Sequence, residues 1–203
     1  MIGAIVLAAG ESRRMGRQKM LLPYGDKTVV EHVVDTLAGG PIAGLIVVTG
    51  KDHDRIREAV GYRAVQLIHN PDWETGMLSS VRAGIAAAPP DWEGLLIAIG
   101  DQPAIQRDVV KRVVNRFDRG GKGIVVPVYG GRRGHPLVFA SAYRRDVLTR
   151  HEDRGLRGLL RDYPDDIAEV TVDTDTVLTD MDHPEDYQRE LRSLEARTRE
   201  EGR

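Results

Sequence analysis

The sequence has no cysteine, few aromatic residues and almost no surplus of either charge. The absence of cysteine excludes disulfide bonds, zinc–thiolate sites and a thiol nucleophile. Lysine and arginine together number 29 and aspartate and glutamate 31, so the formal net charge is only -2. A charge so close to balance gives no indication of nucleic acid as a partner, and any affinity for phosphate has to come from a local cluster of cations.

Long hydrophobic runs are also missing. The apolar stretch at the N-terminus is too short for a signal peptide or a membrane span and lacks a basic lead-in and a cleavage site. We therefore expect a cytoplasmic protein that inserts into no membrane. With 203 residues, 41% of them hydrophobic, the chain suits one α/β domain, and no repeat, low-complexity segment or linker divides it.

The most informative stretch is residues 4–23, which joins an apolar run to a loop rich in glycine and cations. The run stops abruptly at Ala-Ala-Gly10, as a buried parallel strand does at the carboxyl edge of its sheet. The loop then holds two glycines, two adjacent arginines and Lys19. Backbone amides and three cations can therefore converge on one polyanion.

Two common phosphate-binding motifs are absent from this loop. A dinucleotide fingerprint needs a second glycine two residues after the first, and Gly10 has none there. A Walker A loop needs four residues between its glycines followed by Lys-Ser or Lys-Thr. Here five residues separate Gly10 from Gly16, and Arg17 follows.

The remaining pattern alternates strands with helices. Thr28 and Glu31 form a capping box, and apolar residues then recur at helical spacing until Gly39. Further strands are expected at 45–49, 64–69, 95–99, 123–127 and 167–172, with a strand after Pro136, and helices at 52–60, 109–117, 143–150 and 154–160. The order implies right-handed crossovers. We expect an α/β fold: a single three-layer αβα domain with a mostly parallel, Rossmann-like sheet.

The pattern L-A-A-G-x-S-x-R-M-G-x-x-K runs from Leu7 to Lys19 and is followed by Leu-Leu-Pro. It resembles the molybdenum cofactor cytidylyltransferases, within a wider group of guanylyl- and sugar-phosphate nucleotidyltransferases. The resemblance implies Mg²⁺-dependent transfer of CMP from CTP to a molybdopterin-type phosphate acceptor, with release of pyrophosphate. Ala9 favours cytidylyl transfer, since the guanylyl relatives usually have glycine there.

Two aspartates are candidate metal ligands. The apolar strand at 95–99 ends in Gly-Asp101-Gln-Pro, where a buried carboxylate needs a cation, although Asp101 is also compatible with a turn or with a cap for a helix beginning near Gln106. The resemblance makes Asp101 and Asp182 the ligands of Mg²⁺, with His183 standing where the family has threonine. From the residues alone, Asp182 reads as a helix N-cap before Pro184, a role that could coexist with metal binding.

The resemblance also implies the remaining site residues. Arg14, Lys19 and Asp101 are expected to be catalytic. The expected nucleotide-binding residues are Leu7, Ala8, Ala9, Gly10, Glu11, Ser12, Arg14, Lys19, Asn70, Gly76, Ser79, Ser80 and Asp101. Of these, Gly76 would admit the backbone to the base, and Ser79 or Ser80 would hydrogen-bond it; the alternative is that both serines cap a helix or are solvated.

The acceptor side is expected to comprise Gln102, Pro103, Arg133, Gly134, His135, Pro136 and Arg157. His135 is equally consistent with a packed turn histidine and Arg157 with a solvated arginine. The chain would then divide into a nucleotide-binding half at about 1–105, an acceptor-binding half at about 106–185 and a surface helix at about 184–200 that frays beyond about residue 197.

The expected partners are a nucleoside triphosphate, the phosphate acceptor, and a downstream molybdoenzyme or chaperone. Three other functions stay open at this point. They are molybdenum cofactor guanylyl transfer, sugar-phosphate nucleotidyl transfer, and a non-catalytic accessory protein that binds nucleotide or cofactor.

Overall fold

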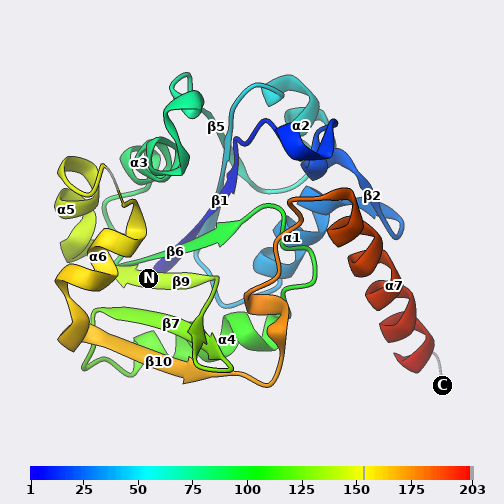
Figure 1. The fold of residues 1–203 in the computed structure, drawn as a ribbon. Helices are drawn as coiled ribbons and strands as arrows, with labels where there is room; N and C mark the ends of the chain where they lie inside the picture. Colours follow the sequence, from blue (N-terminus) through cyan, green and yellow to red (C-terminus); the bar gives the residue numbers. More distant parts are fainter. Residues whose placement is uncertain (153, 202–203) are drawn as a thin grey trace.

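The computed structural model describes residues 1–152 and 154–201. Its main sheet has eight strands in the order β10-β7-β9-β6-β1-β4-β5, with β8 beside β7 (Figure 1). The strands are β1 (Ile2–Ala8), β4 (Gly44–Thr49), β5 (Gln66–His69), β6 (Gly94–Ile99), β7 (Ile124–Tyr129), β8 (Arg132–Arg133), β9 (Leu137–Ala140) and β10 (Ile167–Thr171). A separate hairpin pairs β2 (Pro23–Tyr24) with β3 (Lys27–Thr28).

The sheet is mostly parallel, as the sequence predicted. Strand β1 pairs in parallel with β4 and β6, β4 with β5, and β7 with β10. Strand β9 is antiparallel to both β6 and β7, and β8 is antiparallel to β7. Leu137 at the start of β9 pairs with Ile97 near the end of β6, so the residues just before β9 lie at the edge where β1, β4 and β6 end.

Seven helices are present in the described residues: α1 (Val29–Ala38), α2 (His53–Val60), α3 (Met77–Ala87), α4 (Arg107–Asp118), α5 (Arg144–Thr149), α6 (Leu156–Asp162) and α7 (Pro184–Glu201). Short 3-10 turns lie at Arg13–Met15, Lys19–Leu21, Trp73–Thr75, Ser141–Tyr143, Pro164–Asp166 and Asp175–Val177. Helices α1, α2 and α4 cover one face of the sheet and α3, α5 and α6 the other (Figure 1).

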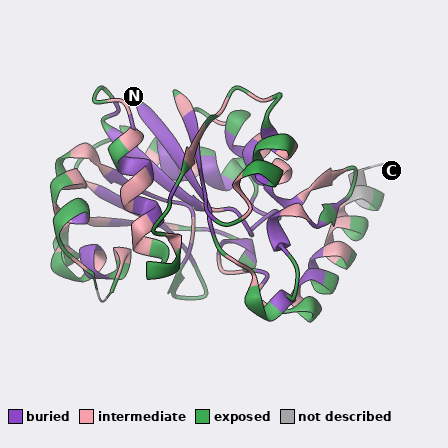
Figure 2. Cartoon of the chain, turned by 90° about the horizontal axis from the view of Figure 1, so that it is seen from above, coloured by how far each residue is buried: buried purple, intermediate pink, exposed green. Residues whose placement is uncertain are grey.

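Alternation along the strands builds both halves of the core. In β1, Ala4 and Val6 pack with the valines of α1 and α4, whereas Ile5 and Leu7 pack with α3, α5 and α6. Strand β1 is therefore buried on both faces, like the other strands at the centre of the sheet in Figure 2. Burying each such side chain fully contributes about 1.5–3 kcal/mol. The predicted three-layer αβα architecture is confirmed.

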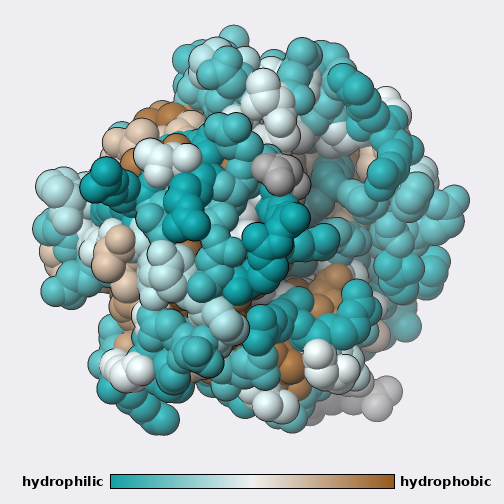
Figure 3. Space-filling model, turned by 60° about the vertical axis from the view of Figure 1, so that its left-hand side comes forward, coloured by the Kyte–Doolittle hydropathy of each residue, from teal (hydrophilic) through white to brown (hydrophobic). Residues whose placement is uncertain are grey.

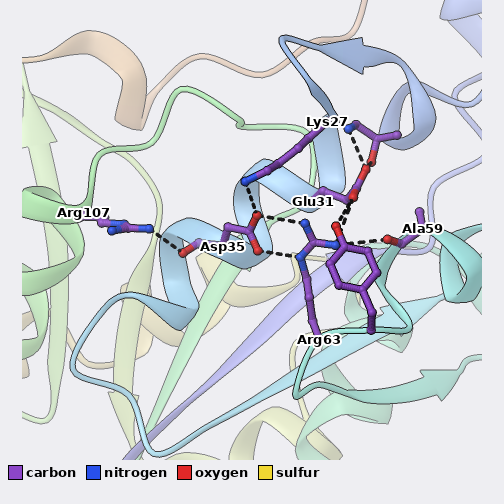
Figure 4. A network of polar contacts seen from close by, with 8 residues as sticks. Lys27, Glu31, Asp35, Ala59, Arg63 and Arg107 are labelled. Carbon is purple, nitrogen blue, oxygen red and sulfur yellow. Dashed lines mark hydrogen bonds and ion pairs between the residues drawn. The ribbon is translucent and has the colours of Figure 1, made fainter. Parts of the chain in front are cut away.

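The start of α1 is fixed by the predicted capping box, which also takes part in a wider ion-pair network. Glu31 Oε2 accepts a hydrogen bond from the Thr28 backbone at 2.8 Å, and its other oxygen accepts from Arg63 at 3.1 Å. The Arg63 guanidinium, only 8% exposed, also donates to Asp35 through two nitrogens at 2.6 and 2.9 Å (Figure 4). This network ties α1 to the segment after α2, away from the carboxyl edge.

Helix α7 is the last helix of the chain and contributes to a third apolar cluster, which comprises Met15, Leu22, Tyr24, Val29, Met181 and Tyr187. The Tyr187 hydroxyl donates to the carbonyl oxygen of Pro23 at 2.6 Å. The helix expected at about 184–200 runs from Pro184 to Glu201. Among the described residues, no helix is both long and apolar enough to cross a membrane, and on the face in Figure 3 hydrophobic residues form only small patches.

Candidate functional site

A cavity of about 360 Å³ lies at the carboxyl edge, between the loop after β1, the end of β6 and the turn before α3. Its lining residues are Leu7, Ala9, Gly10, Glu11, Ser12, Arg13, Lys19, Met20, Trp73, Glu74, Gly76, Met77, Ser80, Ile99 and Asp101. The size suits a small organic ligand. The loop at 9–19 supplies much of the wall.

Gln18, which the sequence analysis did not single out, organises this loop. Its side chain is buried, and its Nε2 donates to the Gly10 carbonyl oxygen at 3.1 Å and to Asp52 at 2.9 Å. Its Oε1 accepts from the Ser12 hydroxyl at 2.9 Å and from the Met20 amide at 3.3 Å. Both ends of the loop are thus held by one fully hydrogen-bonded amide, while Ser12 adopts a left-handed φ of 59°.

Lys19, Asp101 and Asp182 meet at the edge of the cavity. The nearly buried Lys19 ammonium contacts Asp101 Oδ2 and lies 3.0 Å from Asp182 Oδ1. Arg14 donates to the other oxygen of Asp182 at 2.9 Å. Two carboxylates from distant parts of the sequence therefore lie on either side of one ammonium group.

Burial and pairing act in opposite directions on these groups. Burial alone would lower the pKa of Lys19, but the charges of Asp101 and Asp182 outweigh it and raise the pKa above its usual value. Burial raises the pKa of Asp101 despite the adjacent ammonium. The hydrogen bond from Lys19 lowers the pKa of the more exposed Asp182.

The donor set fits a hard divalent cation. Asp101 Oδ1 is buried and has no hydrogen-bond partner in the part of the chain that the structure describes. Within that part, no group of three or more His, Cys, Asp or Glu side chains forms a complete metal cage. Two carboxylates suit an ion such as Mg²⁺ or Mn²⁺ that completes its shell with water and phosphate oxygens.

The structure contradicts the reading of Asp182 as a helix N-cap. The side chain of Asp182 faces Lys19 and Arg14, and α7 begins only at Pro184. Asp186, one turn into the helix, instead accepts hydrogen bonds from the backbone amides of Asp182 at 3.2 Å and His183 at 2.8 Å. Asp186 thus takes the capping role, and the carboxylate of Asp182 faces the two cations instead. Asp101 likewise caps no helix, since α4 begins at Arg107 after Gln106.

The predicted base-contacting residues have two different surroundings. Ser80 and Gly76 line the cavity. Asn70 donates to the hydroxyls of Ser79 at 2.8 Å and Ser80 at 3.0 Å, and the Ser79 hydroxyl lies 2.8 Å from the Gly76 carbonyl oxygen. Asn70 and Ser79 thus hydrogen-bond within the turn rather than toward the cavity.

Some of the predicted acceptor residues lie along the same edge, next to Asp101 or just before β9. Gln102 and Pro103 form the buried turn after β6. The His135 amide donates to the Val177 carbonyl oxygen at 2.9 Å, and burial together with the nearby Arg157 charge lowers the pKa of His135 to about 4. Its ring is therefore neutral at pH 7.

Arg133 does not join this group. It lies on β8 and pairs with Glu169 of β10 at 2.8 Å. Gly134 next to it donates to the Pro127 carbonyl oxygen at 2.9 Å, so this part of the predicted acceptor set holds the β7–β8 hairpin against the sheet.

Six cavity residues were not among the site residues predicted from the sequence: Arg13, Met20, Trp73, Glu74, Met77 and Ile99. Trp73 lies three residues before Gly76 and Met77 directly after it, and Gly76 has a φ of +120° where the chain turns into α3. The turn-rich composition before α3 indicated a loop there, but nothing in the pattern indicated which of its side chains would face the cavity.

Comparison with known proteins identifies the family. The model of the MobA-like NTP transferase domain matches residues 4–167. The chain belongs to this family. It is 27% identical over 187 residues to the molybdenum cofactor cytidylyltransferase of Escherichia coli (strain K12), an alignment that covers 92% of this chain and 93% of that protein.

Two further relatives of this MobA-like nucleotidyltransferase are informative. The nicotine blue oxidoreductase of Paenarthrobacter nicotinovorans is 33% identical over 172 residues, covering 80% of this chain and 83% of that protein. The crystal structure of Rv0371c from Mycobacterium tuberculosis H37Rv superposes with a TM-score of 0.85 at 29% identity, covering 94% of this chain and 97% of that one. Rv0371c has also been crystallised in complex with manganese, and that structure gives a TM-score of 0.80.

Proposed function

We propose that the protein transfers CMP from CTP to a molybdopterin-type phosphate acceptor and releases pyrophosphate. The observation that carries the proposal is the meeting of Asp101 and Asp182 at Lys19, on the rim of a cavity walled by the loop after β1. The likeness to the molybdenum cofactor cytidylyltransferase supports the choice of base and acceptor.

In this proposal Asp101 and Asp182 hold a divalent cation, with Mg²⁺ as the expected ion. When bound, the cation would neutralise the phosphates of the nucleotide and orient the α-phosphorus. Its arrival would require Lys19 and Arg14 to leave the carboxylates. The two side chains would then neutralise the charge of the departing pyrophosphate.

No protein base is needed for this reaction. The acceptor is a phosphate monoester whose second pKa is near 6, so at pH 7 its attacking oxygen is already largely ionised. That oxygen forms a bond to the α-phosphorus as the bond from the α-phosphorus to the bridging oxygen breaks. Positioning and electrostatic stabilisation are then the main catalytic effects. The neutral imidazole of His135 and the charged guanidinium of Arg157, which acts on it, are the groups that would position the acceptor.

The test is to incubate the protein with Mg²⁺, the molybdopterin acceptor and each of CTP, GTP, ATP and UTP, and to measure pyrophosphate release. Pyrophosphate is expected with CTP, and Asp101→Ala should abolish it while the circular dichroism spectrum stays unchanged. A preference for GTP would make the protein a guanylyltransferase. Activity with hexose 1-phosphates would favour a sugar-phosphate acceptor, and no turnover with any triphosphate would favour an accessory protein.

An oxidoreductase is a second candidate, because the nicotine blue oxidoreductase is 33% identical to this chain. The loop after β1 lacks the glycine spacing of a dinucleotide fingerprint, which favours the transferase. The oxidoreductase would become the favoured function if the protein oxidised NADH or NADPH in the presence of an added dye and released no pyrophosphate in the first assay.

A further inference from the structure

The turn at residues 70–76 uses its polar groups to hold itself together. Asn70 Oδ1 accepts a hydrogen bond from the Asp72 amide at 3.0 Å, and the Asn70 amide group donates to Ser79 at 2.8 Å. The Thr75 hydroxyl donates to the Asp72 carbonyl oxygen at 2.8 Å. Because these groups already have partners, a ligand that used them would have to break the turn.

Trp73 is held by this turn at the wall of the cavity. It begins the 3-10 turn Trp73–Thr75, is half-buried, and is the only aromatic side chain among the described residues that line the cavity. The glycine at residue 50, just after β4, leaves room for the Trp73 side chain. A Cβ atom at residue 50 would lie 2.7 Å from Trp73 Cγ and 2.4 Å from the Ala9 carbonyl oxygen. The absence of a side chain at residue 50 therefore lets the tryptophan lie close to the loop after β1.

The sheet order puts Trp73 and the charged groups on opposite sides of β1. Asp101 follows β6, which pairs with one edge of β1, while Gly50 follows β4, which pairs with the other. Lys19 contacts Asp101 on the β6 side. A triphosphate drawn to Lys19 and Asp101 would therefore extend its nucleoside toward Trp73 and the neighbouring Met77, which is 59% exposed.

We propose that the indole of Trp73, carried by the turn that Asn70 and Ser79 hydrogen-bond together, stacks on the nucleobase. An aromatic face in a small apolar pocket recognises a planar ring without demanding a particular pattern of donors and acceptors. The inference rests on the proposed function, since it requires a nucleotide in this cavity. It changes the expected role of Ser79 from base contact to support of the turn.

The experiment compares two ligands, CTP and inorganic tripolyphosphate, by isothermal titration calorimetry in Mg²⁺. Stacking contributes about 1–3 kcal/mol per base, so Trp73→Ala should weaken CTP binding roughly 5- to 150-fold. The same substitution should leave tripolyphosphate binding within about 2-fold. Trp73→Phe keeps a ring and should recover most of the lost CTP affinity. An equal loss for both ligands, or a leucine variant that binds CTP as well as the phenylalanine variant, would overturn the proposal.

Tryptophan fluorescence gives a second readout. The chain has two tryptophans, and Trp92 is 5% exposed and packed against Gly3 and Gly44 at the opposite edge of the sheet. CTP should therefore quench the emission of wild-type protein and of Trp92→Phe, but not that of Trp73→Phe. If the protein releases pyrophosphate but CTP does not change the emission of Trp73, the stacking proposal is wrong and the proposed transferase activity is unaffected. If the wild-type protein binds no triphosphate, both the stacking proposal and the proposed transferase function are wrong.

Discussion

Lys19 and Asp182 are separated by 163 positions, yet Nζ of Lys19 lies 3.0 Å from Oδ1 of Asp182. The contact joins the loop after the first strand to the segment before the last helix. Arg14 reaches the same carboxylate at 2.9 Å. This part of the charged rim is therefore assembled from the two ends of the chain, and both ends have to be in place before the contact can form.

Replacing Asp182 by Asn should remove activity while leaving the fold intact. The side chain is 42% exposed, so the isosteric amide is accommodated, but one proposed metal ligand loses its charge. We expect kcat/KM for pyrophosphate release to fall at least about 100-fold, the upper end of the effect of altering groups that only surround a metal. The exposed Asp173→Asn is the control and should retain activity within about 3-fold. Equal activity of the two variants would count against the metal assignment.

Replacing Gln18 by Glu should weaken nucleotide binding in a pH-dependent way. The new carboxylate would face the Gly10 carbonyl oxygen and the Asp52 carboxylate, to which the amide now donates. Like charge and burial raise the pKa of such a group, so lowering the pH toward 5 restores one proton for donation. We expect KM for CTP to rise about 10-fold at pH 8 and to recover partly at pH 5.5, measured by steady-state kinetics. For the exposed Gln66→Glu, the ratio of its KM for CTP to that of the wild type should be the same at both pH values. If this ratio is also independent of pH for Gln18→Glu, the proposed role of the Gln18 amide is wrong.

Removing Arg63 should destabilise the protein, and more so at neutral than at acid pH. Hydrogen bonds from Arg63, and also from Lys27, hold the pKa of Asp35 at about 2, below its usual value. The pair therefore contributes stability that is fully present above about pH 4 and is lost as the pH falls toward 2. Arg63→Met should lower the free energy of unfolding by about 3 kcal/mol at pH 7, and by clearly less at pH 3.

Urea unfolding followed by circular dichroism at both pH values provides the measurement. The matched control is Arg57→Met, which breaks an exposed pair with Asp54 and should cost less than about 1 kcal/mol at either pH. If the two variants lost the same free energy of unfolding at pH 7, the Arg63 network would stabilise the protein no more than an exposed ion pair does.

The pKa of His135 should respond to Arg157. Burial and the Arg157 charge lower it to about 4, so the folded state resists protonation and the protein loses stability as the pH falls from about 6.5 toward 4. Arg157→Met should raise this pKa, as followed by nitrogen-detected NMR titration of the imidazole, with His135→Asn used to assign the signal. The exposed Arg161→Met on the same helix should leave it unchanged. A titration midpoint still near 4 without Arg157 would assign the whole effect to burial.

Most of the fold could be predicted because its signals are local. The capping box of Thr28 and Glu31, the valine spacing of α1 and the apolar strand before Asp101 depend on neighbours a few residues apart, and the structure has them where expected. The reversed direction of β9 has no local signal. Strand Leu137–Ala140 is short and apolar on both faces, and its direction follows only from its partners β6 and β7.

The site could be predicted in part for the same reason. The loop from Gly10 to Lys19 is a continuous motif, but which carboxylates meet the ammonium of Lys19 depends on how distant segments pack. The role of Asp186 as the helix cap, which leaves Asp182 directed at Lys19, was visible only once both were placed. Gln18 and Trp73 were missed because neither residue type is distinctive until its surroundings are known.

The antiparallel strand β9 has a further consequence for how such a protein is put together. In a purely parallel sheet, only the carboxyl ends of the strands lie at the edge where ligands bind. A single reversed strand also places its amino end at that edge. The peptide leading into Leu137 thereby lies next to the peptide leaving Ile99, with no extra layer or hinge between them. If the acceptor binds beside residues 134–136 as proposed, both reactants would be held at the same edge of a single sheet.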